Sequence, residues 1–523
     1  MENRQECMET FSICCPATLE PVAEYPLMSP QEVDNAVKAA RMAFSHWSKS
    51  AIETRRRILR KAAGILAENA EKYAREIAEE NGKTTMDAML ADIFSTAHLL
   101  DHYARKLASY LAPVRGEGTI FLPGRKTYYV LEPKGVIGVI SPWNYPFTLS
   151  AGPAITAVAA GNAVVLKPSS QTTRSGLIVK EIFDLAGLPG GVIQVVTGSG
   201  SVTGEALANH PDLDMIFFTG STQVGYDINV KAAQRLIPVI MELGGKDVAI
   251  VTKNADLDRA VSGITWACFT NCGQTCIGTE LILVDRAVYE PFTAKLVQAV
   301  NGLRLGKACG EIGAMTMESQ YRIVEQQLDD AVAKGAKVLA GGKPAIRHKG
   351  RFFAPTILAD TTPDMKVRHE ETFGPLKCIL PFDTIEEALE IANSSEYGLS
   401  GAVYTQNQEE GREIARKLKT GSVNINDALI TYMLPSLPFG GVKKSGLGRY
   451  HGKEGLQAFS DVKSVTEYWW GLKREVFWYP IPSYIETAFP HFMQMMYGDG
   501  LGKRIKGANS AAFVMLRSFF QKA

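Results

Sequence analysis

The sequence predicts an α/β fold with two parallel-sheet regions. Short apolar runs alternate with helical stretches from Val136 onward, as in parallel strands joined by crossover helices. A second set of this kind begins near Val248 and continues to about Asn424. A chain of 523 residues is long enough for two or three domains. The apolar runs of the first set are residues 136–140, 163–166, 192–196 and 215–218.

The segment before this alternation is predicted to be helical. Ser29 and Glu32 form a capping-box pattern, with Pro30 at the first helical position. We expect two further helices, at about residues 52–81 and 85–111. In the helix that begins at Pro30, apolar residues recur at helical spacing, at Val33, Val37, Ala40 and Phe44.

Glycines mark two further boundaries. Gly124 begins a turn between two β-like runs, one of which is residues 127–131. Gly335 follows a helical stretch at residues 321–334, as a C-cap glycine does.

Composition narrows the class of protein. Hydrophobic residues make up 46% and charged residues 21%, as in globular enzymes, and a net charge of +1 gives no reason to expect a nucleic-acid partner. Residues 1–6 show no signal peptide, and no apolar run approaches the roughly 18 residues of a spanning helix. We therefore expect a cytoplasmic protein.

The cysteines indicate a reducing compartment and no disulfide scaffold. Cys268, Cys272 and Cys276 fall at helical spacing, without the Cys pair or His cluster that a zinc site needs, so no metal is expected. The others are Cys7, Cys14, Cys15, Cys309 and Cys378.

Three segments carry candidate chemistry. Cys276 offers a thiol, Glu242 a carboxylate, and Asn144 a side-chain amide beside Pro142. A nucleophile, a base and an oxyanion donor are what thioester-forming oxidation of a carbonyl requires.

In these and other segments the chain resembles the aldehyde dehydrogenase superfamily, from about residue 20 to about 470. The matching segments are residues 141–144, 161–170, 218–222, 242–246, 273–276, 371–375 and 438–441. The resemblance implies a Rossmann-type cofactor domain, an α/β catalytic domain and a small β oligomerisation element. It places the cofactor domain at 1–117 and 136–245, the catalytic domain at 246–424, and the oligomerisation element at 118–135 and 425–470. Residues 471–523 form a C-terminal extension.

The resemblance also implies a nicotinamide dinucleotide site. Trp143 would lie against the cofactor, Glu371 would bind the nicotinamide ribose hydroxyls, and Phe373 would pack beside the nicotinamide. Glycine-containing helix starts suit the pyrophosphate. The candidate cofactor residues are Ile140, Ser141, Pro142, Trp143, Lys167, Ser169, Ser170, Gly200, Gly204, Phe218, Thr219, Gly220, Ser221, Val224, Leu243, Gly244, Glu371 and Phe373.

Ser170 departs from the pattern of NAD-preferring relatives, which carry Glu there. Such a Glu would repel a 2′-phosphate, whereas Ser170 can donate a hydrogen bond and Lys167 supplies positive charge. We predict that NADP is preferred and NAD also accepted; the alternative is no preference. Arg174 is a further candidate for the phosphate site.

Within the resemblance, Cys276 is the nucleophile and Cys272 a rival thiol that we expect to be a small helix-packing residue. Asn144 and the Cys276 backbone N–H would stabilise the oxyanion. Glu242 would activate the water that releases a carboxylic acid, since relatives that transfer the acyl group to coenzyme A usually lack this base.

The segment after Asn144 contains no Lys or Arg through Pro153, which favours uncharged aliphatic or aromatic aldehydes. An NADP-dependent succinate-semialdehyde dehydrogenase is the alternative, and a non-catalytic relative is less favoured.

The resemblance implies a homodimer or homotetramer. The aromatic extension after residue 471 suggests membrane contact, or an arm packed on a neighbouring subunit or over the substrate mouth; the arm is favoured.

Overall fold

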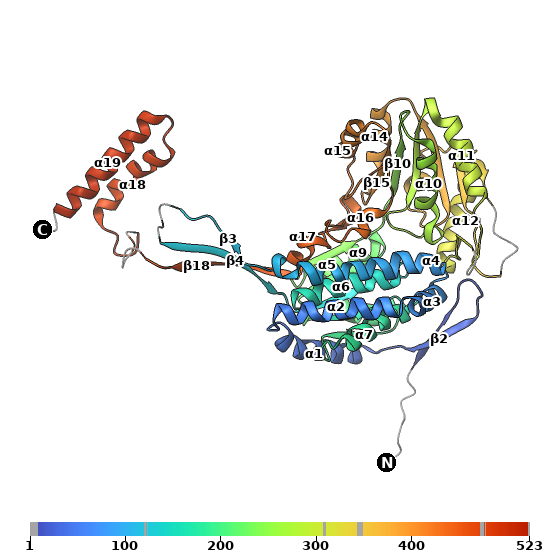
Figure 1. Ribbon diagram of the computed structural model, residues 1–523, viewed down its shortest axis with the longest axis horizontal. Helices are drawn as coiled ribbons and strands as arrows, with labels where there is room; N and C mark the ends of the chain where they lie inside the picture. Colours follow the sequence, from blue (N-terminus) through green and yellow to red (C-terminus); the bar gives the residue numbers. More distant parts are fainter. Residues whose placement is uncertain are drawn as a thin grey trace, which may run out of the picture. The chain divides into compact units, whose positions relative to one another are not determined.

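The computed structural model describes residues 9–119, 122, 124–306, 310–342, 349–470, 475 and 477–520, with the backbone alone at 514–520. Cys7, Cys309 and the N-terminal residues 1–6 lie outside the described residues. The chain forms two compact units (Figure 1). One comprises residues 1–112 and 130–463, and the other 113–129 and 464–523.

The first sheet contains the predicted early strands. Its order is β17-β9-β8-β5-β6-β7, parallel except for β17, which pairs antiparallel with β9. The strands are β5 (Val136–Ile140), β6 (Ala163–Lys167), β7 (Ile193–Val195), β8 (Met215–Thr219), β9 (Val239–Glu242) and β17 (Gly446–Leu447). The predicted runs match these strands within about two residues.

Helices pack against this sheet, and several of them lie beside one another in Figure 1. The capping box at Ser29 is confirmed, with Glu32 donating its backbone N–H to the Ser29 side chain. The helices are α1 (Pro30–Trp47), α2 (Ile52–Glu68), α3 (Ala70–Asn81), α4 (Thr85–Asp87), η1 (Ala88–Phe94), α5 (Ser95–Tyr110), α6 (Pro146–Ala160), α7 (Thr173–Ala186), η2 (Gly200–Gly204), α8 (Glu205–Ala208) and α9 (Thr222–Ala233).

Two long predicted helices are interrupted. The stretch 52–81 breaks at Asn69, whose side chain donates to the Ile65 carbonyl at 2.9 Å and so satisfies the end of α2. The stretch 85–111 contains the π-helix η1, a form that is frequent at functional sites. The prediction of two continuous helices was therefore wrong in these details.

The second sheet has the order β12-β13-β14-β11-β10-β15-β16, with only β12 antiparallel. Its strands are β10 (Asp247–Val251), β11 (Thr279–Asp285), β12 (Lys337–Ala340), β13 (Thr356–Ala359), β14 (Leu376–Phe382), β15 (Gly401–Tyr404) and β16 (Asn424–Ile425). Helices α10 (Leu257–Phe269), η3 (Thr270–Gly273), η4 (Arg286–Val288), α11 (Tyr289–Asn301), α12 (Glu318–Ala333), α13 (Lys366–His369), α14 (Ile385–Ser394) and α15 (Gln408–Lys417) accompany it. Gly335 follows the end of α12 with a φ of +97°, as predicted.

Smaller elements complete the fold. β1 (Thr10–Cys14) and β2 (Pro21–Pro26) form a two-stranded sheet, and α16 (Ile430–Met433), η5 (Lys443–Ser445) and α17 (Gly452–Ala458) follow the second sheet.

The second unit contains β3 (Val114–Arg115), parts of β4 (Arg125–Pro133) and β18 (Ser460–Tyr468), and helices α18 (Ser483–Tyr497) and α19 (Leu501–Phe520). Among the helices that the structure describes, none is both long enough and apolar enough to cross a membrane.

Candidate active site

Cys276 lies in the loop between η3 and β11, and the three cysteines do not share one helix. Cys268 is in α10, but Asn271 and Cys272 have φ angles of +51° and +57°, which end the helix. Cys272 is fully buried in the core, as expected of a packing residue, but its backbone is not helical. Gly245 lets the chain pass close to this loop, since a Cβ there would lie 2.8 Å from the Cys276 carbonyl oxygen. No cluster of three or more metal-ligand side chains occurs in the described part of the chain.

The three thiols differ in access. Cys268 and Cys272 are fully buried, and burial raises their pKa values to about 12. Cys276 is partly exposed and lines two cavities. Burial, followed by the nearby Glu242 carboxylate, raises the pKa of the Cys276 thiol too. Cys276 is thus the one of these three thiols that a small molecule can reach.

The larger cavity is a polar cleft of about 830 Å³ between the two sheets. It brings together the predicted residues Pro142, Trp143, Asn144, Thr219, Gly220, Ser221, Glu242, Leu243, Gly244, Cys276, Glu371 and Phe373. The N-terminal end of α9, whose free N–H groups suit a phosphate, lines the same cleft.

The smaller cavity reaches Cys276 by another path and is largely apolar. Among the residues that the structure describes, Asp87 is the one charged residue in its lining. The others are Leu90, Ala91, Ser95, Tyr145, Thr148, Leu149, Trp266, Thr270, Thr275, Ile277, Leu429, Tyr432 and Met433. This lining includes residues of α6, as the sequence predicted for the substrate side.

Other predicted cofactor residues do not line the larger cleft: Ile140, Ser141, Lys167, Ser169, Ser170, Gly200, Gly204, Phe218 and Val224. Ser141 instead shares a hydrogen bond of 2.6 Å with Ser150. Phe218 is buried against Gly220, where a Cβ would lie 2.5 Å from its ring. Val224 is exposed on α9.

Lys167, at the end of β6, is a buried cation. Its side chain forms no hydrogen bond or ion pair with any residue that the structure describes, and burial lowers its pKa to about 8. A Cβ on Gly204 would lie 3.9 Å from the Lys167 Cε, so the lysine reaches the glycine segment 200–204. Ser169 and Ser170 are partly exposed in the turn that follows β6.

The Arg174 side chain is held by two carboxylates. Its guanidinium donates to Glu76 and to Glu181, both at 2.8 Å. Its charge is already paired, so the suggestion that it adds to a phosphate site was wrong in this structure.

Glu242 ends β9 with an unsatisfied carboxylate. Both oxygens are buried and lack a hydrogen-bond partner among the described residues, and burial raises the pKa of Glu242 well above its usual value. A Cβ on Gly440 would lie 2.8 Å from Oε1, so the glycine leaves room for the carboxylate. An unpaired buried acid beside a cleft is a candidate general base.

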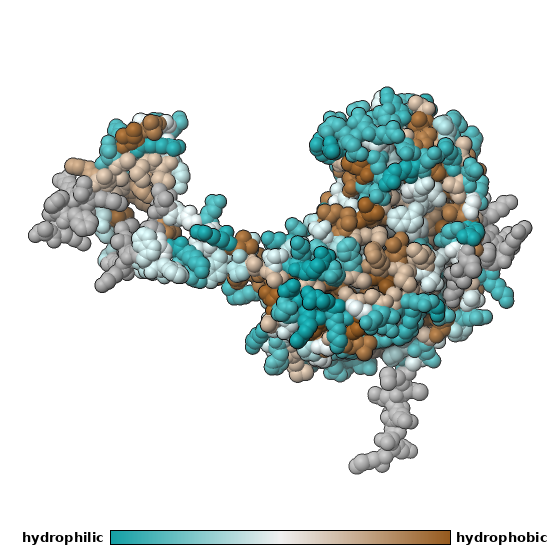
Figure 2. Space-filling model, in the orientation of Figure 1, coloured by the Kyte–Doolittle hydropathy of each residue, from teal (hydrophilic) through white to brown (hydrophobic). Residues whose placement is uncertain are grey.

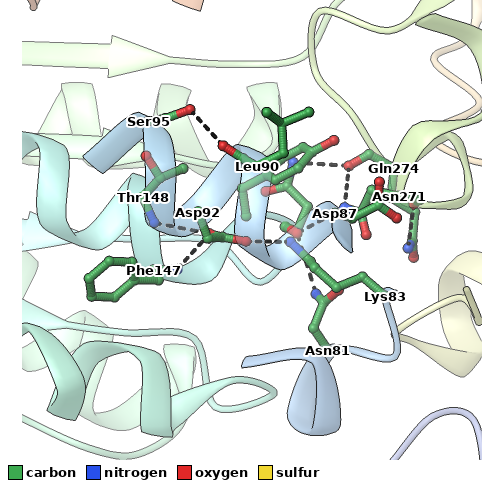
Figure 3. Close-up of polar contacts among 12 residues, drawn as sticks. Asn81, Lys83, Asp87, Leu90, Asp92, Ser95, Phe147, Thr148, Asn271 and Gln274 are labelled. Atoms are coloured by element: carbon green, nitrogen blue, oxygen red, sulfur yellow. Dashed lines mark hydrogen bonds and ion pairs between the residues drawn. The ribbon is translucent and has the colours of Figure 1, made fainter. Parts of the chain in front are cut away.

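The backbone at Asn144 is held by two other asparagines, Asn81 and Asn271, which are labelled in Figure 3. The Asn144 backbone carbonyl accepts from Asn271 Nδ2 at 2.9 Å, and Asn81 Nδ2 donates to the Trp143 backbone carbonyl at 2.6 Å. The Asn144 side chain donates to the Gln274 carbonyl at 3.1 Å, which leaves its second N–H available, since an amide carries two. Sequence reasoning missed both asparagines as positioning residues, although Asn271 lies within the cysteine segment.

A fully buried ion pair supports the same loop (Figure 3). Lys83 and Asp92 lie 2.7 Å apart, and Asp92 accepts the backbone N–H groups of Phe147 and Thr148 at the start of α6. The carboxylate therefore caps α6, at the end that favours negative charge. The sequence did not indicate this pair, because single charged residues are common in helical stretches.

Glu371 lies against the glycines after Glu242. Its Oε1 accepts the Gly245 N–H at 2.9 Å, and burial, aided by Glu280, raises its pKa to about 8. The Trp143 and Phe373 rings meet edge to face, with centroids 5.4 Å apart. Two aromatic rings, a carboxylate that can accept from hydroxyls and a helix N-terminus fit a nicotinamide dinucleotide.

A model of the aldehyde dehydrogenase family matches residues 3–465. The chain belongs to the aldehyde dehydrogenase family. The predicted α/β fold is confirmed. The prediction of an oxidoreductase that oxidises aldehydes with NAD(P)+ is confirmed too.

Individual relatives agree with this assignment. A Mycobacterium ulcerans (strain Agy99) protein, provisionally named an NADP(+) succinate-semialdehyde dehydrogenase, is 40% identical over 86% of this chain and 87% of its own. A Methylomonas protein named 4,4'-diapolycopene aldehyde oxidase is 35% identical over 98% of this chain and 96% of its own. The NAD+ complex of aldehyde dehydrogenase from Bacillus cereus has a TM-score of 0.84 and 36% identity, covering 88% of this chain and 93% of that chain.

Proposed function

We propose that this dehydrogenase oxidises uncharged, apolar aldehydes to carboxylic acids and prefers NADP+ to NAD+. The observation that carries the proposal is the position of Cys276, which lines both the polar cleft and the apolar cavity. A cofactor on one side and an aldehyde on the other would meet at this thiol.

The apolar cavity supports an uncharged substrate. Among the described residues that line it, none is a Lys or Arg. Asp87 is fixed by hydrogen bonds from Thr84 and Thr270, both at 2.9 Å. The carboxylate of succinate semialdehyde would find no cation here and would face an acid, which is unfavourable in a buried site.

The relatives bear on both candidate substrates. The Mycobacterium ulcerans protein is named for succinate semialdehyde. The Methylomonas protein is named for 4,4'-diapolycopene aldehyde, and its match extends through nearly the whole chain. The apolar lining favours the second, and succinate semialdehyde remains the alternative.

We assign the reaction steps to three residues. The Cys276 thiolate attacks the aldehyde carbon, and the free N–H of the Asn144 amide, with the Cys276 backbone N–H, stabilises the oxyanion. A nicotinamide dinucleotide held beside Trp143, Glu371 and Phe373 would supply the hydride acceptor that oxidation to a thioester needs. Glu242, once deprotonated, takes a proton from the water that hydrolyses the thioester.

The NADP+ preference is supported by the surroundings of the turn after β6. Lys167 is buried without a partner among the described residues, and Ser170 brings no negative charge. A 2′-phosphate would supply the missing partner for Lys167. We expect the segment Gly200–Gly204, which Lys167 reaches, to lie beside the cofactor.

We also propose a homodimer or homotetramer, and a division into the cofactor, catalytic and oligomerisation parts expected from the sequence. β18 is an edge of the three-stranded sheet, and an edge strand can pair with another chain. A homodimer or homotetramer formed through residues 118–135 and 425–470 is consistent with this arrangement.

The test is a set of initial rates with NAD+ and NADP+, for aldehydes from propanal to dodecanal, benzaldehyde and succinate semialdehyde. We expect kcat/KM to rise with chain length and to be higher with NADP+. A sharp preference for succinate semialdehyde would refute the substrate assignment, and equal rates with both cofactors would refute the cofactor preference.

A further inference from the structure

The hairpin of α18 and α19 packs through small residues. Gly507 and Ala511 are buried and lie one helical turn apart on α19. A Cβ on Gly507 would lie 2.4 Å from the Met495 backbone nitrogen, so the two backbones approach closely. Ala488 is the buried residue of α18. Such small residues let the two helix backbones approach closely, so the seam has little room for large side chains.

Several large apolar side chains of the hairpin are exposed. Phe489, Met493 and Tyr497 recur every four residues on α18 and are exposed. On α19, Leu501 is 75% exposed and Phe513 is 66% exposed. In Figure 2 brown, apolar surface lies on this hairpin beside teal, hydrophilic surface. A hairpin stable in water would place such side chains in the seam.

The charge of α19 has one sign. Its sequence contains Lys503, Arg504, Lys506 and Arg517 and no Asp or Glu. The first three are exposed and form no ion pair with residues that the structure describes. Trp469 and Trp470, which precede the hairpin in sequence, are also exposed. Aromatic and basic residues together are typical of segments that lie in a membrane interface.

We propose that the α18–α19 hairpin binds the surface of a lipid bilayer with anionic headgroups, lying in the interface without crossing it. The sequence favoured an arm packed on protein, but the small-residue seam and the exposed apolar side chains were visible only in the structure. A second copy of this chain is the alternative occupant. The proposal does not depend on the substrate assigned above.

The experiment is flotation of the full chain with vesicles of phosphatidylcholine, alone or mixed with phosphatidylglycerol. We expect the protein to float with the mixed vesicles, and binding to weaken as salt is added. Replacing both lysines, K503Q with K506Q, should lower the partition coefficient roughly thirtyfold. A double variant I505Q with F513Q should also reduce binding.

Leu236→Gln is the matched control, because Leu236 is 93% exposed but belongs to the first unit. All variants should retain propanal oxidation and oligomer mass. Failure of the unmodified protein to float with mixed vesicles would overturn the proposal, as would unchanged flotation of the lysine variant. A smaller oligomer in I505Q with F513Q, without vesicle binding, would assign the surface to a second copy.

Discussion

The two cavities that meet at Cys276 differ in their chemistry. The larger cleft contains the carboxylates of Glu242 and Glu371, and the Asn144 amide. The smaller cavity is lined by aliphatic and aromatic side chains, with Asp87 as its only charge among the described residues. The difference separates two tasks, because charge chemistry lies on one side of the thiol and substrate selection on the other. Substitutions in one cavity should therefore alter its own task and leave the task of the other cavity unchanged.

The largest effect is expected at the thiol that both cavities share. Cys276→Ala should lower kcat by about 10⁴-fold or more, as loss of a catalytic nucleophile does. Cys272→Ala is the matched control, since its thiol is fully buried, and it should keep most activity. Steady-state rates of both variants check this, and the reverse pattern would make Cys272 the nucleophile.

The next effect lies on the polar side. Asn144→Ala should lower kcat/KM by about 10²-fold, because one oxyanion donor is lost. The KM for NADP+ should stay nearly constant. A loss confined to cofactor binding would show that Asn144 shapes the cleft without stabilising the oxyanion.

A cation on the apolar side should change selection while leaving the chemistry intact. Met433→Arg should lower kcat/KM for dodecanal by about tenfold or more and raise it for succinate semialdehyde. Met433→Gln separates charge from size. If both variants prefer dodecanal as the unmodified protein does, the apolar cavity does not hold the substrate.

The smallest effect concerns Lys167 and pH. Burial lowers its pKa to about 8, so the free lysine is charged below that pH and neutral above it. The KM for NADP+ should rise about tenfold as pH increases through this region, since a charge-assisted hydrogen bond is lost. The KM for NAD+ should stay nearly constant over the same pH range. Lys167→Gln should remove the difference between the two cofactors. Parallel pH profiles in the unmodified protein would contradict a phosphate contact.

Strand positions could be predicted from the sequence because buried parallel strands form continuous apolar runs, as in β5 and β8. Helix interruptions could not, since the break at Asn69 depends on a side-chain bond to the Ile65 carbonyl and η1 has the composition of an ordinary helix. The left-handed backbone at Asn271 and Cys272 could not be predicted either, because the spacing of the residues does not indicate it.

The candidate site shows the same division. Cys276, Glu242 and Asn144 could be predicted because they lie in short segments that resemble a family, and the structure brings them to one cleft. The buried Lys83–Asp92 pair was missed, because its partners on α6 are distant in sequence. The pairing of Arg174 with Glu76 and Glu181 also depends on contacts made only in the folded chain.

The most direct test of the account is to capture the acyl group on the enzyme. Glu242→Gln should slow hydrolysis by about 10²- to 10⁴-fold and leave the first oxidation possible. After incubation with dodecanal and NADP+, mass spectrometry should find one dodecanoyl group on the peptide that contains Cys276. An acyl group on Cys272, or no covalent adduct despite a burst of NADPH, would contradict the proposed roles of Cys276 and Glu242.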